Sequence, residues 1–317
     1  GIVGKSLTPE VAVRFAGAFG TWLTSRTEFN PDVLVCQDGR EGGDMFMHAV
    51  TAALQGVGCS VHLSGTLPTP SAGIAAADNQ CDAAIIITAS HNPSEWNGLK
   101  VVLCEDGSAN APSAHLAAQI ADAFRKGEIR YSDTPGTVFA SKHDSIVHEV
   151  RVKLRPRFRD MTIGCKPGPI ARVVLDSVNA SGAGVSEDLL RSIGVDHVVQ
   201  LHGDGSGVFP HPPEPTAENL SGEGGLCDAV PGLKADIGFA QDPDADRLAI
   251  VDENGTYIGE EYTLALCAEA LLSAPNDPTE EHPTEEPASN ESPPQRGPSA
   301  SEGSHTALPP QGSPPPP

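Results

Sequence analysis

Short apolar runs alternate with segments of helical periodicity along this chain, and the alternation starts twice. Residues 33–36, 59–63 and 83–87 are apolar runs of strand length. Between them, residues 9–23 and 45–55 place apolar side chains at helical spacing, the first behind a Thr-Pro-Glu helix start. Such alternation predicts an α/β fold.

The same pattern begins again after a polar, proline-containing passage near residues 151–169. Strands are predicted at residues 172–175, 197–201 and 235–240, and a helix at residues 187–192. An Asn-Gly turn then joins residues 248–251 to residues 256–258 as a hairpin, and residues 260–272 begin another helix. We therefore expect a second α/β unit and the start of a third.

Two segments lie outside these units. Residues 274–317 consist of Pro, Ser, Glu, Thr and Gly with Leu308 as the one large apolar side chain, so we expect them to be disordered. The run Arg151, Lys153, Arg155, Arg157 and Arg159 would place its charges on one face of an extended segment. It is interpreted either as a solvated linker or as a phosphate-steering surface.

The net charge and the composition restrict the classes of partner that the protein can bind. A formal net charge of -22 argues against nucleic acid and anionic membranes, so an anionic substrate needs a local basic pocket. The sequence contains no apolar run of about 20 residues and no signal sequence, so we expect a cytoplasmic protein. The seven cysteines form no C-x-x-C pair, so we expect them to be buried and reduced. The first residue is Gly, so we expect that preceding sequence is missing.

The first candidate site is the segment Thr88-Ala89-Ser90-His91-Asn92-Pro93, which directly follows the run 85–87. Ligands bind beyond the carboxyl ends of strands in open α/β sheets, so Ser90 stands where a nucleophile is presented. The residues alone leave the alternative of an ordinary loop serine open, because the adjacency of Ser90 and His91 is a weak signal.

The second candidate site is Asp242-Pro243-Asp244-Ala245-Asp246-Arg247, which follows the predicted strand 235–240. Three carboxylates at alternate positions repel one another unless a hard divalent cation lies between them, and Arg247 suits a phosphate. A solvated acidic turn is the alternative. An EF-hand is disfavoured, because Arg247 stands in place of the required glycine and strands flank the loop.

Two further cations, Arg40 in Asp38-Gly39-Arg40 and Lys100 in Asn97-Gly98-Leu99-Lys100, are candidates for anion binding or proton transfer. Each on its own is more typical of a surface charge.

Together, these motifs resemble the α-D-phosphohexomutase family, which includes phosphoglucosamine mutase, phosphomannomutase and phosphoglucomutase. Supporting stretches are Leu7-Thr8-Pro9-Glu10, Pro68-Thr69-Pro70 and Pro213-Glu214-Pro215-Thr216. The resemblance implies two consecutive mixed-sheet α/β domains: residues 1–152 with the phosphoserine and residues 153–256 with the metal loop. Residues 257–273 would start a third domain, followed by the tail at residues 274–317.

The resemblance also implies the chemistry. Ser90 would carry the phosphoryl group, and Ser90, Asp242, Asp244 and Asp246 would hold Mg²⁺. Arg247 and Arg40 would bind phosphate, and His91 and Lys100 would act in catalysis, Lys100 as general acid or base. The reaction would interconvert hexose 6-phosphate and hexose 1-phosphate through a hexose 1,6-bisphosphate.

The sequence departs from the family pattern at both ends. Members open with Gly-Ile-Arg-Gly, and we interpret Gly1 as its last glycine, so its arginine is absent. The Gly-Glu-x-Ser-Gly sugar loop of the third domain and the phosphate loop of the fourth are not found, which predicts either a fragment or a reading-frame error that produces residues 274–317. The alternatives are a catalytically incomplete mutase that acts as an interaction protein and a metal-dependent phosphatase.

Overall fold

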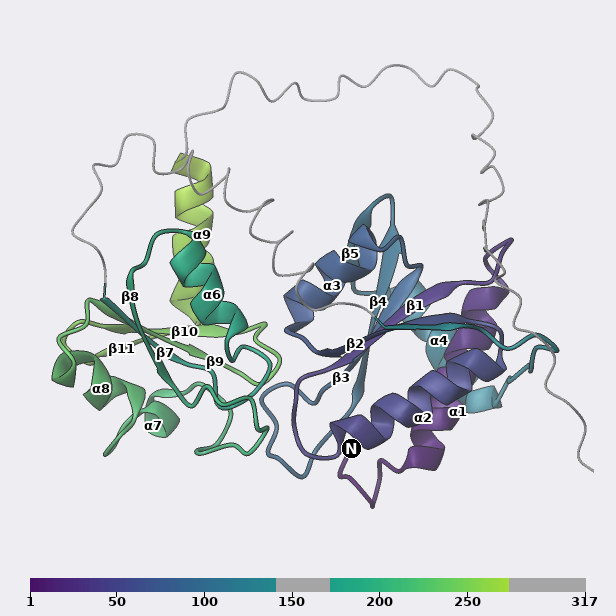
Figure 1. Ribbon diagram of the computed structural model, residues 1–317, viewed down its shortest axis with the longest axis horizontal. Coiled ribbons are helices and arrows are strands. Elements are labelled where there is room, and N and C mark those ends of the chain that lie inside the picture. The colour runs from purple at the N-terminus through teal and green to yellow at the C-terminus, as the bar shows by residue number, and fades with distance from the viewer. Residues whose placement is uncertain (141–171, 274–317) are drawn as a thin grey trace, which may run out of the picture. The chain divides into compact units, whose positions relative to one another are not determined.

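The computed structural model describes residues 1–140 and 172–273, and these contain two β-sheets with helices on both faces (Figure 1). The basic run at residues 151–159, the 152/153 domain boundary and the segment 274–317 lie outside the described residues. The predicted α/β class with mixed sheets is confirmed.

The first sheet has the strand order β5-β4-β3-β1-β2-β6. Strands β1, β2, β3 and β6 run parallel, and β4 and β5 are antiparallel to their neighbours. The elements are α1 (Pro9–Thr24), β1 (Asp32–Gln37), α2 (Gly43–Gly56), β2 (Ser60–Thr66), α3 (Thr69–Asp78), β3 (Ala83–Ile87), β4 (Leu99–Glu105), β5 (Ser108–Asn110), α4 (Ala114–Lys126) and β6 (Val138–Ala140).

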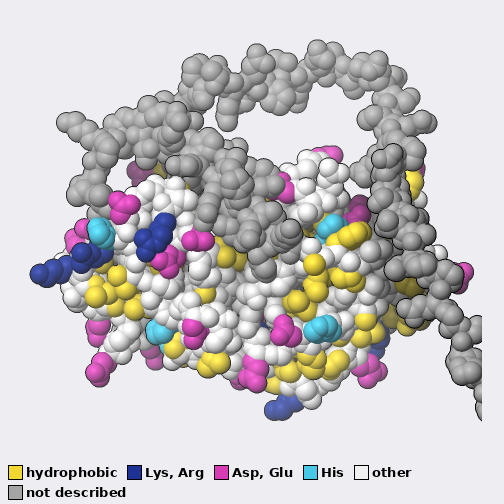
Figure 2. Space-filling view, in the orientation of Figure 1, with side chains coloured by type: hydrophobic (Ala, Val, Ile, Leu, Met, Phe, Trp, Pro, Cys, Tyr) yellow, Lys and Arg dark blue, Asp and Glu magenta, His cyan; other side chains and the backbone are white. Residues whose placement is uncertain are grey.

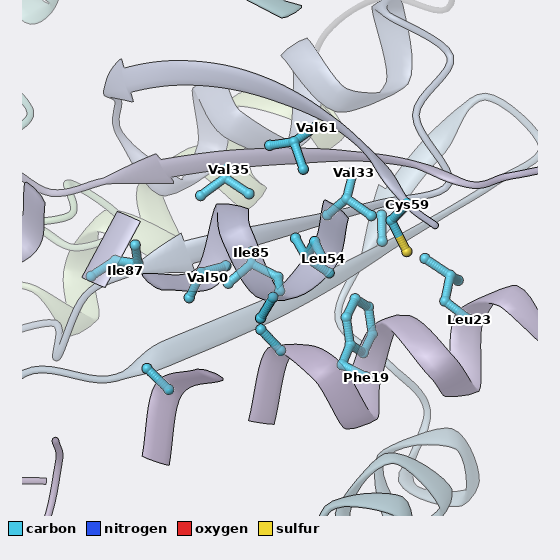
Figure 3. Packing of buried hydrophobic residues seen from close by; sticks show 14 of the residues in the cluster. Phe19, Leu23, Val33, Val35, Val50, Leu54, Cys59, Val61, Ile85 and Ile87 are labelled. Carbon is cyan, nitrogen blue, oxygen red and sulfur yellow. The ribbon is translucent and has the colours of Figure 1, made fainter. Parts of the chain in front are cut away.

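Side chains of the central strands alternate between two apolar layers, because successive residues of a strand point to opposite faces. Val33, Val35, Ile85 and Ile87 pack against helices α1, α2 and α4 (Figure 3). The intervening side chains, such as Leu34 and Ile86, pack against α3 on the other face. Both faces of β1 and β3 are therefore buried, which explains why these strands read as continuous apolar runs.

The second sheet has the strand order β11-β10-β9-β7-β8, with β7 parallel to β8 and β9, and β10 antiparallel to β9 and β11. Its elements are β7 (Arg172–Asp176), α6 (Val185–Ser192), β8 (His197–Leu201), α7 (Ala217–Leu220), α8 (Leu226–Gly232), β9 (Ile237–Gln241), β10 (Leu248–Asp252), β11 (Tyr257–Gly259) and α9 (Glu261–Ser273). Helices α7 and α8 cover one face of the sheet, and α6 and α9 lie on the other (Figure 1).

Acidic side chains are spread over the face shown in Figure 2, as the net charge of -22 requires. The cysteine expectation holds in part: Cys36, Cys59 and Cys81 are buried, but Cys267 on α9 is exposed. Among the helices described, none is both long and apolar enough to cross a bilayer.

Phe19 on α1 is fully buried in the first apolar layer (Figure 3), whereas Phe29 in the following loop is 69 % exposed. We predict that Phe19→Ala lowers the free energy of unfolding by about 3–5 kcal/mol, because it leaves a cavity against α2 and the sheet. Phe29→Ala should change it by less than about 0.5 kcal/mol. Urea denaturation of both variants tests this, and equal losses would contradict the assigned packing.

Candidate active site

The loops that carry the predicted site residues all lie at the carboxyl edges of the parallel strands. Ser90 follows β3, Arg40 follows β1, and the acidic loop 242–246 follows β9. Lys100 stands at the beginning of β4, and Arg247 directly precedes β10; both strands run antiparallel, so they start at the same edges. This edge is where open α/β sheets bind ligands.

The loop after β3 holds Ser90 in an uncommon backbone conformation. Its φ is 51°, in the left-handed region that non-glycine residues adopt rarely. The Ser90 N–H donates to Thr88 Oγ1 (2.8 Å), and Arg40 donates to the Ser90 carbonyl oxygen. Thr88 in turn donates its hydroxyl to Asp38 Oδ2 (2.7 Å). Neighbouring buried groups therefore hold the conformation of Ser90.

Arg40 lies beneath this loop and is only 1 % exposed. Its Nε pairs with Asp38 Oδ2 at 2.8 Å, and its Nη1 donates to the carbonyl oxygens of Asn92 (3.3 Å) and Trp96 (2.8 Å). Burial raises the pKa of Asp38, and the contacts with Arg40 and Thr88 oppose that rise. The structure thus places Arg40 against the backbone of the serine loop, and its predicted phosphate contact stays a prediction.

The acidic loop meets Ser90 directly. The Ser90 hydroxyl donates to Asp242 Oδ2 at 2.8 Å, although the two residues belong to different sheets. Asp242 and Asp244 are 0 % exposed, so the loop is not a solvated acidic turn, and the flanking elements are strands β9 and β10, so it is not an EF-hand.

Lys100 lies between two of the carboxylates. Its Nζ is 2.5 Å from Asp244 Oδ2 and 2.8 Å from Asp246 Oδ2. Burial opposes the charged ammonium, but both hydrogen bonds favour it, and the net effect raises the pKa of Lys100. Burial and the neighbouring charge of Asp244 raise the pKa of Asp242. In Asp244 the hydrogen bonds from Lys100 and Thr69 outweigh burial and lower the pKa.

The three aspartates fit a metal ion. Their oxygen atoms lie within 4.8 Å of one another. Asp244 Oδ1 is buried and has no hydrogen-bond partner in the described residues, so it is an acceptor without a donor. An unsatisfied buried carboxylate oxygen is costly unless a cation approaches it. Carboxylate oxygens are the ligands that hard divalent cations prefer.

His91 and Arg247 stand at the rim of the site. His91 Nδ1 is 3.4 Å from Ser90 Oγ, and His91 Nε2 is 3.8 Å from Glu214 Oε1. The Arg247 guanidinium faces Glu214 (3.9 Å) and Glu260 (3.4 Å). The structure therefore brings Ser90, His91, Lys100 and the aspartates together, while Arg247 contacts acidic side chains at the edge.

A cavity of about 880 Å³ opens beside Lys100 and Asp246 and is also lined by Thr69, Gly73 and Asn110. This volume lies within the range of about 300–1,000 Å³ typical of small-molecule sites.

Thr69, Thr88 and Ser181 also contribute hydrogen bonds to the site, although no sequence motif predicts a role for them. Thr69 Oγ1 donates to Asp244 Oδ2 at 2.6 Å, and Ser181 Oγ donates to the Pro243 carbonyl oxygen at 2.7 Å. Thr69 follows β2 at the same sheet edge as Ser90, and this position in the sequence is a signal for a residue near the site. Ser181 had only an unspecific glycine-rich turn around it.

Comparison with known proteins agrees with this architecture. Residues 1–130 match the model of phosphoglucomutase/phosphomannomutase α/β/α domain I, and residues 161–255 match that of domain II. A phosphoglucomutase/phosphomannomutase of Thermococcus kodakarensis is 33 % identical over 281 residues, and a probable phosphoglucosamine mutase of Methanopyrus kandleri is 35 % identical over 276. Each alignment covers 86 % of this chain, and 58 % and 56 % of the respective relatives.

Solved structures give the same result. A phosphoglucomutase/phosphomannomutase family protein from Burkholderia thailandensis superposes with a TM-score of 0.68 at 28 % identity, covering 86 % of this chain and 57 % of its own. A putative phosphomannomutase from Thermus thermophilus gives 0.66 at 25 % identity, covering 84 % and 59 %. The chain belongs to the phosphoglucomutase/phosphomannomutase family and spans somewhat more than half the length of these relatives.

The family motif near the N-terminus can also be matched three residues further along than in our interpretation. Gly1-Ile2-Val3-Gly4 aligns with Gly-Ile-Arg-Gly residue by residue, with Val3 at the arginine position. Gly4 has a φ of +74°, a conformation that favours glycine, and the Val3 N–H donates to the Glu95 carbonyl oxygen beside the serine loop. Both registers leave the chain without that arginine.

We predict that Thr88→Val loosens the serine loop, because it removes one of the donors to buried Asp38 and leaves the Ser90 N–H without its acceptor. The free energy of unfolding should fall by about 1–3 kcal/mol, and the amide of Ser90 should exchange hydrogen faster. Thr27→Val, which removes a hydrogen bond to the Phe29 carbonyl oxygen, is the matched control. Unchanged exchange at Ser90 would contradict this account.

Proposed function

We propose that this chain forms the phosphoryl-transfer part of a phosphohexomutase that interconverts hexose 6-phosphate and hexose 1-phosphate. The observation that carries the proposal is the hydrogen bond from Ser90 to Asp242 (2.8 Å), which places a nucleophilic hydroxyl against buried carboxylates that fit a metal ion. The family assignment supports the reaction class. An interaction protein would not require such an arrangement.

In this proposal Ser90 Oγ carries a phosphoryl group in the resting enzyme. Asp242, Asp244 and Asp246 together with Ser90 hold Mg²⁺, as the unpartnered Asp244 Oδ1 favours. When bound there, Mg²⁺ neutralises the charge of the carboxylates and of the phosphoryl oxygens, which is the main requirement of phosphoryl transfer.

Residues of the chain would carry out the phosphoryl and proton transfers. The bond between phosphorus and Ser90 Oγ breaks as the free sugar hydroxyl bonds to phosphorus, which gives a hexose 1,6-bisphosphate. Lys100, which contacts Asp244, and His91, whose Nδ1 lies 3.4 Å from Ser90 Oγ, would accept the proton of the sugar hydroxyl and supply the proton that Ser90 Oγ takes up while the bisphosphate is bound. The second phosphate returns to Ser90 Oγ after the intermediate has turned around.

We assign the other cations by their contacts. Arg247 at the rim would bind the phosphoryl oxygens by leaving its carboxylate partners, whereas buried Arg40 acts as a positioning residue for the serine loop. The cavity beside Lys100 and Asp246 is large enough for the sugar phosphate. Phosphoglucosamine is our first choice of substrate, followed by the phosphates of mannose and glucose, in line with the names of the relatives.

The proposed domains are residues 1–152, 153–256 and 257–273, the last being the start of a third domain. Strand β11 pairs with β10, so residues 257–259 complete the second sheet, and we move the proposed start of the third domain from residue 257 to residue 260. Helix α9 follows and exposes Tyr262, Leu264 and Leu272 at 59 %, 78 % and 86 %, as expected of a helix that a further domain covers.

We predict that incubation with a hexose 1,6-bisphosphate and Mg²⁺ adds one phosphoryl group to Ser90. Intact-mass and peptide mass spectrometry measure it. Ser90→Ala should abolish the gain, whereas Ser94→Ala, an exposed serine four residues on, should keep it. Chelation of the metal should also abolish it. Phosphate found elsewhere, or none on Ser90, would refute the proposed nucleophile.

We further predict that Asp244→Asn raises the dissociation constant of Mg²⁺ by more than about tenfold, because changes one shell further out already cost about 10–100-fold. Isothermal titration calorimetry measures the affinity. Asp106→Asn, in an exposed turn of the first sheet, serves as the control for the lost charge. Equal affinities of the two variants would remove Asp244 from the metal site.

A further inference from the structure

A second cluster of ligating side chains lies at the carboxyl edge of the second sheet, apart from the acidic loop. Asp176 ends β7, and His202 follows β8. Because Asp176 pairs in register with Leu201, Asp176 and His202 leave the sheet side by side. The following loop brings back His211, and the ligand atoms of these three residues lie within 4.8 Å of one another.

The three side chains converge on one point. His202 Nδ1 and His211 Nε2 are 2.9 Å and 3.1 Å from the same oxygen, Asp176 Oδ2. The other oxygen, Oδ1, accepts from the Val178 N–H at 3.0 Å, which fixes the carboxylate. These separations are close to the ligand–ligand distance of roughly 3.3 Å in a tetrahedral site with bonds of about 2.0 Å.

The hydrogen bonds of His211 orient its second ring nitrogen toward the carboxylate. His211 Nδ1 is 2.8 Å from the Pro212 carbonyl oxygen, which can only accept, so Nδ1 carries the hydrogen. Nε2 is thereby turned toward Asp176 Oδ2. An outward Nδ1–H bonded to a carbonyl is the usual arrangement of a metal-bound histidine.

The carboxylate is buried, and the two imidazole side chains beside it are partly exposed. Asp176 is 1 % exposed, whereas the side chains of His202 and His211 are 28 % and 17 % exposed, so solvent reaches the two histidines.

We propose that Asp176, His202 and His211 form a binding site for Zn²⁺ that is separate from the oxygen-only site at Asp242, Asp244 and Asp246. Two imidazoles and one carboxylate are ligands that Zn²⁺ takes readily, with the fourth position left to water, whereas Mg²⁺ prefers oxygen ligands. This proposal does not depend on the proposed mutase reaction.

The site would fix the loop that leads to the candidate active site. Between His202 and Glu214 the loop places the Phe209 ring 5.4 Å from the Arg40 guanidinium, and Glu214 reaches His91 (3.8 Å) and Arg247 (3.9 Å). A metal bound at both ends of the segment 202–211 would therefore hold these contacts in place.

The test uses the full chain, freed of metal by a chelator and then kept in excess Mg²⁺ so that the acidic loop is filled. Zn²⁺ titration by calorimetry should show one site of micromolar affinity or better, and Co²⁺ as a probe should give the visible absorption of a tetrahedral nitrogen-ligated ion. His202→Ala and His211→Ala should each weaken binding by about tenfold or more. His115→Ala, an exposed histidine on α4, should not weaken it.

Several outcomes would overturn the proposal: absence of Zn²⁺ binding in excess Mg²⁺, binding that survives both histidine substitutions, or binding lost in Asp242→Asn but kept in His211→Ala. Should the histidine variants fail to fold, anomalous diffraction from Zn²⁺-soaked crystals of the unaltered chain decides. A peak between Asp176, His202 and His211 supports the site, and a peak only at the acidic loop, or none, overturns it.

Discussion

The repulsion among three carboxylates governs the candidate active site. Two unit charges about 4 Å apart repel by about 4 kcal/mol at an effective dielectric constant of about 20, and Asp242 and Asp244 are fully buried. The structure offsets the repulsion with donors from the other sheet: Lys100, Thr69 and Ser90. One acceptor, Asp244 Oδ1, has no donor within residues 1–140 and 172–273. Burying three carboxylates that repel one another costs free energy, and a cation bound between them would reduce this cost.

In the serine loop, too, hydrogen bonds offset an unfavourable arrangement. A left-handed backbone at Ser90 is unfavourable for a residue with a side chain, and it persists because Thr88 and Arg40 hold both sides of the peptide. Arg40 is itself secured by Asp38. Buried polar groups that satisfy one another rigidify a loop, so the hydroxyl of Ser90 points at Asp242 before any substrate arrives. We infer that the Asp38–Arg40 pair is buried under the loop because it holds this network in place.

The sequence predicted the strongly apolar and the chemically distinctive parts of the molecule well. Strands β1 and β3 and helix α1 lie close to where periodicity placed them, because their side chains are buried in regular patterns. Helix α3 was missed, since its alanine-rich sequence buries only Ala72, Ala75 and Ala76 and shows little amphipathicity. Helix α4 was missed although Leu116, Ile120 and Phe124 recur every four residues. The meeting of Ser90 with Asp242 rested on family resemblance, because no local pattern encodes a contact between residues 152 positions apart.

Both clusters of candidate metal ligands lie beyond the carboxyl ends of strands. Parallel strands deliver their following residues to one edge, which brings Asp176 and His202 together in the second sheet. Asp242 and Ser90 also follow the carboxyl ends of strands, but these strands belong to different sheets, and the two residues meet through a hydrogen bond between their loops. What differs is the donor atoms. Oxygen atoms alone at the acidic loop suit a hard ion, whereas the imidazoles of His202 and His211 suit a borderline one. A chain with a net charge of -22 attracts all cations, so it is the donor atoms at each edge, and not the overall field, that would decide which ion each site holds.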